Sequence, residues 1–165
     1  NLNLKVKFRE SFRPFAPAVI EEDLNDWFDS ETSNSYMLLV SNVKESKLIN
    51  NSVKSEGFEQ LNDKRSEIPA VTHVDNSARI QTVNEKSNKR FYKLLKEFKK
   101  ITNVPILINT SFNIRGEPIV SSVEDAFRCF MGTNLDILVC ENYVILKKDN
   151  KSQKDVNYKD KFKLD

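Results

Sequence analysis

The sequence predicts an α/β protein in which helices pack on a twisted, mixed sheet. Short apolar runs of strand length recur along the chain. Two later segments place their apolar residues at helical spacing, and strand-like and helix-like segments alternate instead of forming separate blocks. The 165 residues, 39% of them hydrophobic and 30% charged, are enough to bury one core. We expect a domain over residues 1–148 and a charged, mobile tail over 149–165.

The first part of the chain predicts an extended entry, a short helix and a buried strand. Two prolines keep residues 12–20 from forming a regular helix. Acidic residues open the expected helix over Glu21–Phe28. The apolar run Tyr36–Val40 predicts a buried strand. Residues 42–67 are polar and predict an exposed or partly disordered loop.

The middle of the chain predicts three strands and the longest helix. Ala70–Asp75 and Ala78–Val83 are expected strands on either side of Asn76-Ser77. Ser87 can cap the helix after them, and Val104–Ile108 is the next expected strand. One apolar stripe of that helix is predicted to face the core: Phe91, Leu94, Leu95, Phe98 and Ile101.

The last part of the domain predicts a helix and a hairpin. Ser121 and Glu124 have the spacing of a capping box. Asp136–Cys140 and Tyr143–Leu146 are expected strands joined by a tight turn. The helix before them is expected to bury one apolar face: Ala126, Phe127, Phe130 and Met131.

Several functional classes are disfavoured by what the chain lacks. Cys129 and Cys140 have no metal-ligand spacing, and with one histidine, His73, we expect no metal site in this chain. Two thiols in apolar surroundings are typical of buried, reduced cysteines and of a cytoplasmic protein. No apolar run approaches the ~20 residues that cross a membrane, so no membrane partner is expected. Three glycines are too few for a glycine-rich phosphate loop.

The segment Asn109–Asn113 is the first candidate site. It comes directly after an apolar strand, and open α/β sheets bind ligands at the carboxyl ends of their strands. Small hydroxyl and amide side chains there can bond phosphate or carbonyl oxygens. An ordinary polar turn at the strand end explains the same residues equally well.

Basic residues form the second set of candidates. In an extended segment Lys7, Arg9 and Arg13 would share one side and could bind phosphate, although from the sequence alone solvated charges near a terminus are the commoner explanation. Arg79 lies in an otherwise apolar stretch and needs a bound anion or a carboxylate such as Asp75. Arg115 can pair with Glu117 in a simple loop ion pair.

Three stretches taken together resemble a known family. They run from Lys7 to Pro17, from Pro69 to Gln81 and from Asn109 to Val120, and they resemble the C-terminal domain of nodulation-protein-U type O-carbamoyltransferases. The resemblance covers residues 4–146. It implies a fold similar to the threonylcarbamoyl-adenylate synthases. It also implies that the domain binds ATP, with Mg²⁺, and carbamoyl phosphate, and forms carbamoyl-adenylate with release of pyrophosphate.

The resemblance also assigns roles to residues and implies a partner. Lys7, Arg13 and Arg79 match the family's basic residues and would be catalytic, because fixed cations stabilise the charge on departing phosphate groups. Asn109 and Ser111 match its polar loop and would orient the nucleotide or the carbamoyl group, with Arg9 and Arg115 as secondary candidates. The chain starts with Asn1 and not methionine, so we expect it to be a piece of a longer protein. The resemblance implies that a preceding N-terminal domain holds a metal site and passes the carbamoyl group to an acceptor hydroxyl.

Two other functions fit the same fold. Seven basic residues between positions 86 and 100 suggest an RNA-binding module. However, the aromatic residues of that helix belong to its core stripe and offer no stacking platform, which argues against nucleic acid. A domain that only packs against its partner is the second alternative, and the matching basic residues argue against it.

Overall fold

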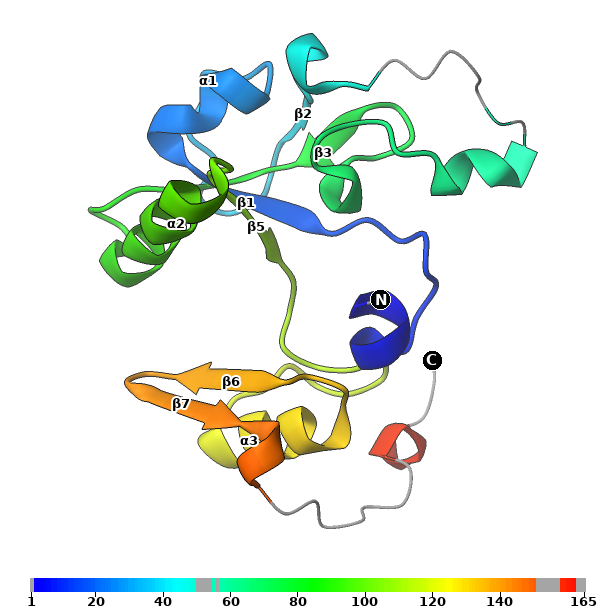
Figure 1. Ribbon diagram of the computed structural model, residues 1–165, viewed down its shortest axis with the longest axis vertical. Helices are drawn as coiled ribbons and strands as arrows, with labels where there is room; N and C mark the ends of the chain where they lie inside the picture. The colour runs from blue at the N-terminus through cyan, green and yellow to red at the C-terminus, as the bar shows by residue number, and fades with distance from the viewer. Residues whose placement is uncertain (1, 50–54, 56, 151–157, 163–165) are drawn as a thin grey trace. The chain divides into compact units, whose positions relative to one another are not determined.

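The computed structural model describes residues 2–49, 55, 57–150 and 158–162. The chain divides into two compact units (Figure 1). The central unit is the continuous stretch Pro14–Thr110, and the terminal unit combines Asn1–Arg13 with Ser111–Asp165. Each unit has its own strands and its own buried apolar cluster.

A mixed three-stranded sheet forms the centre of the central unit. Its middle strand, β1 (Ala16–Ile20), pairs in parallel with β4 (Gln81–Val83) and antiparallel with β5 (Ile106–Asn109). All five residues of β1 are buried, as expected for the middle strand of a sheet. The predicted α/β class with a mixed sheet is confirmed.

The long helix α2 (Lys89–Thr102) packs on this sheet through Leu95, which is fully buried against Ala18, Ile20 and Val83. The prediction that one apolar stripe of this helix faces the core is wrong for two of its residues, because Leu94 is 56% exposed and Ile101 is 85% exposed. Strands of three to five residues cover only a narrow stripe of a helix this long. The helix is capped by Asn88, whose side chain accepts from the Phe91 amide, and not by Ser87 as predicted.

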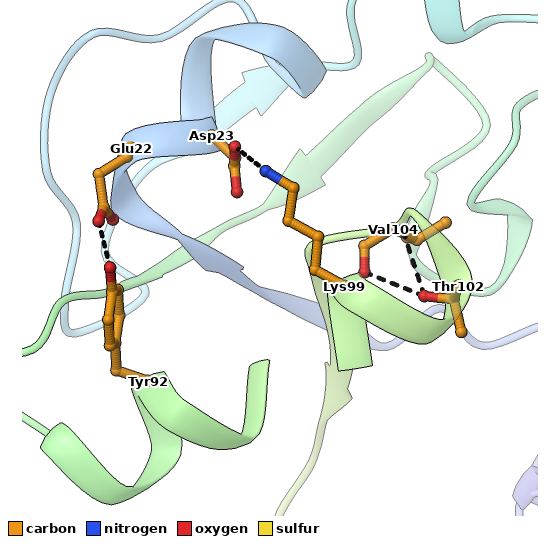
Figure 2. Close-up of polar contacts among 6 residues, drawn as sticks. All are labelled: Glu22, Asp23, Tyr92, Lys99, Thr102 and Val104. Atoms are coloured by element: carbon orange, nitrogen blue, oxygen red, sulfur yellow. Dashed lines mark hydrogen bonds and ion pairs between the residues drawn. The ribbon is translucent and has the colours of Figure 1, made fainter. Parts of the chain in front are cut away.

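Polar contacts tie α2 to the turn after β1 (Figure 2). The predicted short helix consists of a 3₁₀ turn, η2 (Glu21–Asp23), and α1 (Leu24–Trp27). The Tyr92 hydroxyl donates to Glu22, and Lys99 forms a 2.6 Å ion pair with Asp23. At the end of α2 the Thr102 hydroxyl accepts from the Val104 amide at 3.2 Å.

The predicted buried strand Tyr36–Val40 is wrong. Tyr36 and Leu38 are 83% and 80% exposed, and only Val40 enters a strand, β2 (Val40–Asn42). The buried side chain of Asn34 holds this stretch as a loop: its Oδ1 accepts from the Leu38 amide at 2.9 Å, and its Nδ2 donates to the Ile80 carbonyl at 3.0 Å. These local bonds replace strand pairing.

The predicted strand Ala70–Asp75 is also wrong. This stretch contains a 3₁₀ turn, η5 (Pro69–Val71), and then a tight turn in which the Asp75 carboxylate accepts from the Ser77 amide at 3.0 Å. The next predicted strand is split into β3 (Ser77–Arg79), which pairs antiparallel with β2, and β4, which pairs with β1.

The polar stretch 42–67 contains two 3₁₀ turns in its described part, η3 (Glu45–Lys47) and η4 (Gly57–Asn62). The prediction of a partly disordered loop also concerns residues 50–54 and 56, which lie outside the described residues.

The terminal unit contains a helix against a hairpin, as Figure 1 shows. β6 (Ile137–Cys140) and β7 (Tyr143–Leu146) pair antiparallel, which confirms the predicted hairpin. α3 (Val123–Gly132) packs Ala126 and Phe130 on Leu138. Its cap is Ser122, which accepts from the Asp125 amide, and not Ser121. Phe127, predicted to be buried, is 38% exposed.

Three short turns complete the terminal unit: η1 (Asn3–Lys7), η6 (Lys147–Asp149) and η7 (Tyr158–Lys161). Both cysteines are free; Cys129 is buried and Cys140 half-buried. Within the described part of the chain, no helix combines the length and the apolar character needed to span a membrane.

Candidate functional site

A buried lysine organises the candidate loop of the terminal unit. Lys7 is 5% exposed, and its ammonium lies 2.7 Å from the Ser111 carbonyl, 2.5 Å from the Asn113 carbonyl and 2.8 Å from Asn113 Oδ1. Three donors therefore meet three oxygens of one short segment. The structure brings two of the predicted residues, Lys7 and Ser111, together across 104 positions of sequence.

The segment Ser111–Glu117, which we call the site loop, is closed by its own hydrogen bonds. Ser111 Oγ donates to Asn113 Oδ1 at 2.6 Å, and Asn113 Nδ2 donates to the Glu117 carbonyl at 2.7 Å. Its last residues form a turn in which the Glu117 amide donates to the Ile114 carbonyl. The third residue of this turn, Gly116, has φ 78°, a conformation that favours glycine. The site loop is thus a defined structure.

The basic segment beside η1 does not adopt the strand alternation that was predicted. Lys7 ends the turn η1, and Phe8 reverses the chain with φ 50°. The buried side chain of Asn3 then holds the residues after the reversal: its Oδ1 accepts from Arg9 Nε at 2.7 Å, and its Nδ2 donates to the Arg13 carbonyl at 2.7 Å. Local amide bonds, and not strand pairing, position the arginines.

Positive charge dominates this segment. Burial lowers the pKa of Lys7, and the nearby Arg9 lowers it further. Burial also lowers the pKa of Arg9, with Arg13 adding to the effect. The exposed Glu10 carboxylate forms its ion pair with Arg115 at 3.2 Å. Arg115 therefore pairs with Glu10 and not with Glu117, the partner considered from the sequence.

Glu117 connects the site loop to the core of the terminal unit. Its Oε2 accepts from the Ile114 amide at 2.8 Å, and its Oε1 accepts from the Tyr158 hydroxyl. Burial, and after it the Glu117 charge, raises the pKa of the Cys129 thiol to about 12. Burial and the hydrogen bond to Glu117 also raise the pKa of Tyr158. Both groups stay protonated and act as donors near neutral pH.

The other predicted residues lie in the central unit. Asn109, the last residue of β5, donates to the Gln81 side chain at 2.5 Å. Arg79 is exposed on β3, so it avoids the cost of burial that was expected. Among the described residues Arg79 forms no ion pair, and Asp75, its expected partner, instead accepts from Ser77 at 2.6 Å.

The basic residues of α2 are partly neutralised. Lys99 pairs with Asp23 and Lys100 with Glu97, both at 2.6 Å. Lys89 lies 3.7 Å from Glu85. These pairs reduce the net positive charge that a nucleic-acid surface needs.

Sequence reasoning missed the residues that shape the site. The sequence did not indicate a role in the site for four residues: Asn3, Asn113, Glu117 and Tyr158. Asn113 nevertheless lies inside the candidate segment Asn109–Asn113. Their signal is weak, because a polar residue of this kind is most often a solvated surface group. Within the described ranges no group of three or more His, Cys, Asp or Glu side chains is arranged to hold a metal ion.

Comparison with known proteins identifies the family to which this loop and basic segment belong. The family model described as the carbamoyltransferase C-terminus matches residues 1–147. The chain therefore belongs to the carbamoyltransferase C-terminus family.

Three relatives illustrate how far the similarity extends. An uncharacterized protein of Synechocystis sp. is 49% identical over 168 residues, which cover 99% of this chain and 27% of the relative. Nodulation protein NolNO of Sinorhizobium fredii is 44% identical over 150 residues, which cover 89% of this chain and 20% of the relative. A 3'-hydroxymethylcephem-O-carbamoyltransferase of Amycolatopsis lactamdurans is 36% identical over 121 residues, which cover 73% of this chain and 20% of the relative. The chain spans about a quarter or less of the length of these relatives.

Proposed function

We propose that this chain is the nucleotide-handling part of an O-carbamoyltransferase. It binds ATP, with Mg²⁺, together with carbamoyl phosphate and forms carbamoyl-adenylate. An N-terminal domain with its own metal site then transfers the carbamoyl group to an acceptor hydroxyl. Membership of the family supports this proposal, as does the name of the Amycolatopsis relative, an O-carbamoyltransferase.

One observation carries the proposal: the like charges gathered in the terminal unit. Arg9 lowers the pKa of Lys7 and Arg13 lowers that of Arg9, while the nearby acid, Glu10, pairs with Arg115 and offsets only part of this positive charge. Gathering cations is unfavourable unless an anion offsets the repulsion, and such perturbed groups are typical of binding sites. A bound polyphosphate would supply that anion.

The proposed reaction needs charge stabilisation and not a protein nucleophile. Water first cleaves carbamoyl phosphate to carbamate and inorganic phosphate. A carbamate oxygen then forms a bond to the α-phosphorus of ATP, and the bond to pyrophosphate breaks. Negative charge builds on both leaving groups, so fixed cations accelerate both steps.

The proposal gives each predicted residue a role. Arg13 and Arg79 bind phosphate oxygens, and Lys7 holds the site loop while adding positive charge behind it. Ser111 and Asn109 orient the nucleotide or the carbamoyl group. Two further arginines assist with charge, Arg9 and Arg115.

Calorimetry of the intact protein with ATP and Mg²⁺ tests the proposal. A bond to a charged group contributes about 1.5–3 kcal/mol, so Arg79→Ala and Arg13→Ala should each weaken binding by about tenfold or more. Lys93→Ala removes an exposed positive charge from α2 and serves as the control, with affinity unchanged. Pyrophosphate release that depends on carbamoyl phosphate would be the second readout. A folded intact protein that shows no nucleotide binding would refute the proposal.

A further inference from the structure

Tyr158 lies in a segment beyond the residues that the family model matches, yet it is one of the most buried residues of the terminal unit. It is 3% exposed and packs with Ile114 and Cys129. Phe162, one turn later, contacts the edge of its ring at a centroid distance of 5.4 Å. The turn η7 is therefore docked on the unit.

The end of α3 is shaped to receive the Tyr158 ring. Gly132 is the last residue of α3, and a Cβ atom at this position would overlap the ring of Tyr158. The atom nearest to that Cβ is Cγ, close to the tyrosine backbone, so a simple side-chain rotation does not relieve the overlap. A glycine is required here as long as Tyr158 stays docked.

The hydroxyl of Tyr158 reaches the site loop through Glu117. It donates to one carboxylate oxygen of Glu117, and the other oxygen accepts from the Ile114 amide at 2.8 Å. The Glu117 carbonyl in turn accepts from Asn113. Asn113 is bound to the Lys7 ammonium at 2.8 Å. A continuous series of hydrogen bonds therefore joins η7 to the buried lysine.

We propose that Tyr158 is a positioning residue: docking of η7 on α3 fixes the Glu117 carboxylate and thereby the conformation of the site loop. Without the tyrosine hydroxyl, the partly buried carboxylate keeps only the Ile114 amide and the weak Cys129 thiol as donors, and it gains by turning toward water. That movement would release the Ile114 amide. The expected change in the site loop follows from the contacts of Tyr158 and Glu117 alone. A change in nucleotide affinity is expected only if the proposed function holds.

The first test separates the hydroxyl from the ring. Tyr158→Phe keeps the packing and removes the donor, so Cys129 should stay as slow to react with iodoacetamide as in the parent protein. Hydrogen exchange of the Ile114 amide should become about tenfold faster, because a bond to a charged group is lost. Tyr143→Phe removes a hydroxyl from a 74% exposed tyrosine of the same unit and should change neither readout. Unchanged exchange at Ile114 in Tyr158→Phe would overturn the proposal.

The second test uses the glycine. Gly132→Ala should displace the ring, which exposes Cys129 to iodoacetamide and also speeds exchange at Ile114. In a Tyr158→Ala background the same change should have no such effect, because nothing remains for the new methyl group to displace. If Gly132→Ala leaves Cys129 protected in the parent protein, η7 is not docked and the proposal fails.

Nucleotide titration of the same variants distinguishes the two proposals. If Tyr158→Phe weakens ATP binding while the Tyr143→Phe control does not, the position of the site loop matters for binding. If the parent protein binds no ATP, the proposed function fails, and exchange at Ile114 still decides the role of Tyr158.

Discussion

Replacing Lys7 by methionine is the sharpest test of how the site loop is held. The methionine side chain has a similar length and keeps the apolar packing of the stem, but it cannot donate hydrogen bonds. The change removes the three closest contacts of the ammonium, at 2.5–2.8 Å from oxygens of Ser111 and Asn113. It leaves two backbone carbonyls without their donor.

The magnitude depends on those two carbonyls. Leaving a buried acceptor unsatisfied costs about 1–3 kcal/mol, so two would cost about 2–6 kcal/mol. Two effects reduce this figure. Ser111 is exposed, so water replaces part of its lost bond, and the folded protein no longer buries an ammonium ion. We expect Lys7→Met to lower the free energy of unfolding by about 2–3 kcal/mol.

Urea denaturation monitored by circular dichroism measures this difference. Lys5→Met is the matched control, because Lys5 lies on the same turn and is exposed, and its stability should stay within about 0.5 kcal/mol of the parent. If Lys7→Met were as stable as Lys5→Met, the ammonium would not hold the site loop, and the reasoning from burial and contact would be wrong.

Two further predictions concern the cores of the two units. Leu95→Ala should destabilise the protein by about 2–5 kcal/mol in the same urea assay, whereas Leu94→Ala should change stability by about 0.5 kcal/mol or less; equal losses would contradict the burial described for α2. The Cys129 pKa is raised to about 12, so above pH 9 the unfolded thiol ionises while the folded one keeps its proton. Stability should fall from pH 9 toward pH 12, and Cys129→Ala should flatten that fall in pH-dependent denaturation; an equally steep fall in the variant would refute the assignment.

Much of the fold could be predicted because its patterns are local. The hairpin β6–β7 has two apolar runs around a two-residue turn, and the mixed sheet is built from short buried runs between helices. Tyr36–Val40 could not be predicted, since an apolar run normally indicates burial. The side chain of Asn34 decides its structure by binding backbone groups of the loop and of Ile80. The bond from Asn34 to the Ile80 carbonyl joins residues 46 positions apart, so no local pattern in the sequence indicates it.

The candidate site shows the same division. The sequence indicates Lys7 and Ser111 as site residues. It does not predict that Lys7 binds backbone carbonyls of the site loop, because that contact depends on the reversal of the chain at Phe8. Glu117 and Tyr158 could not be selected either. A carboxylate and a tyrosine 41 positions apart carry no common motif, and only the folded core brings them together.

The antiparallel pairing of β1 with β5 has a consequence for synthesis on the ribosome. Ala16 and Asn109 are direct partners in that pairing, so the two ends of the central unit leave its sheet side by side. All residues of the central unit are translated before Ser111, the start of the second part of the terminal unit. Folding of the central unit first would shorten the effective loop between Lys7 and Ser111, which are 104 positions apart, to roughly a dozen residues that pass through the Ala16–Asn109 pair. Most of the entropy cost of bringing Lys7 and Ser111 together would then have been incurred in folding the central unit, before the last residues emerge.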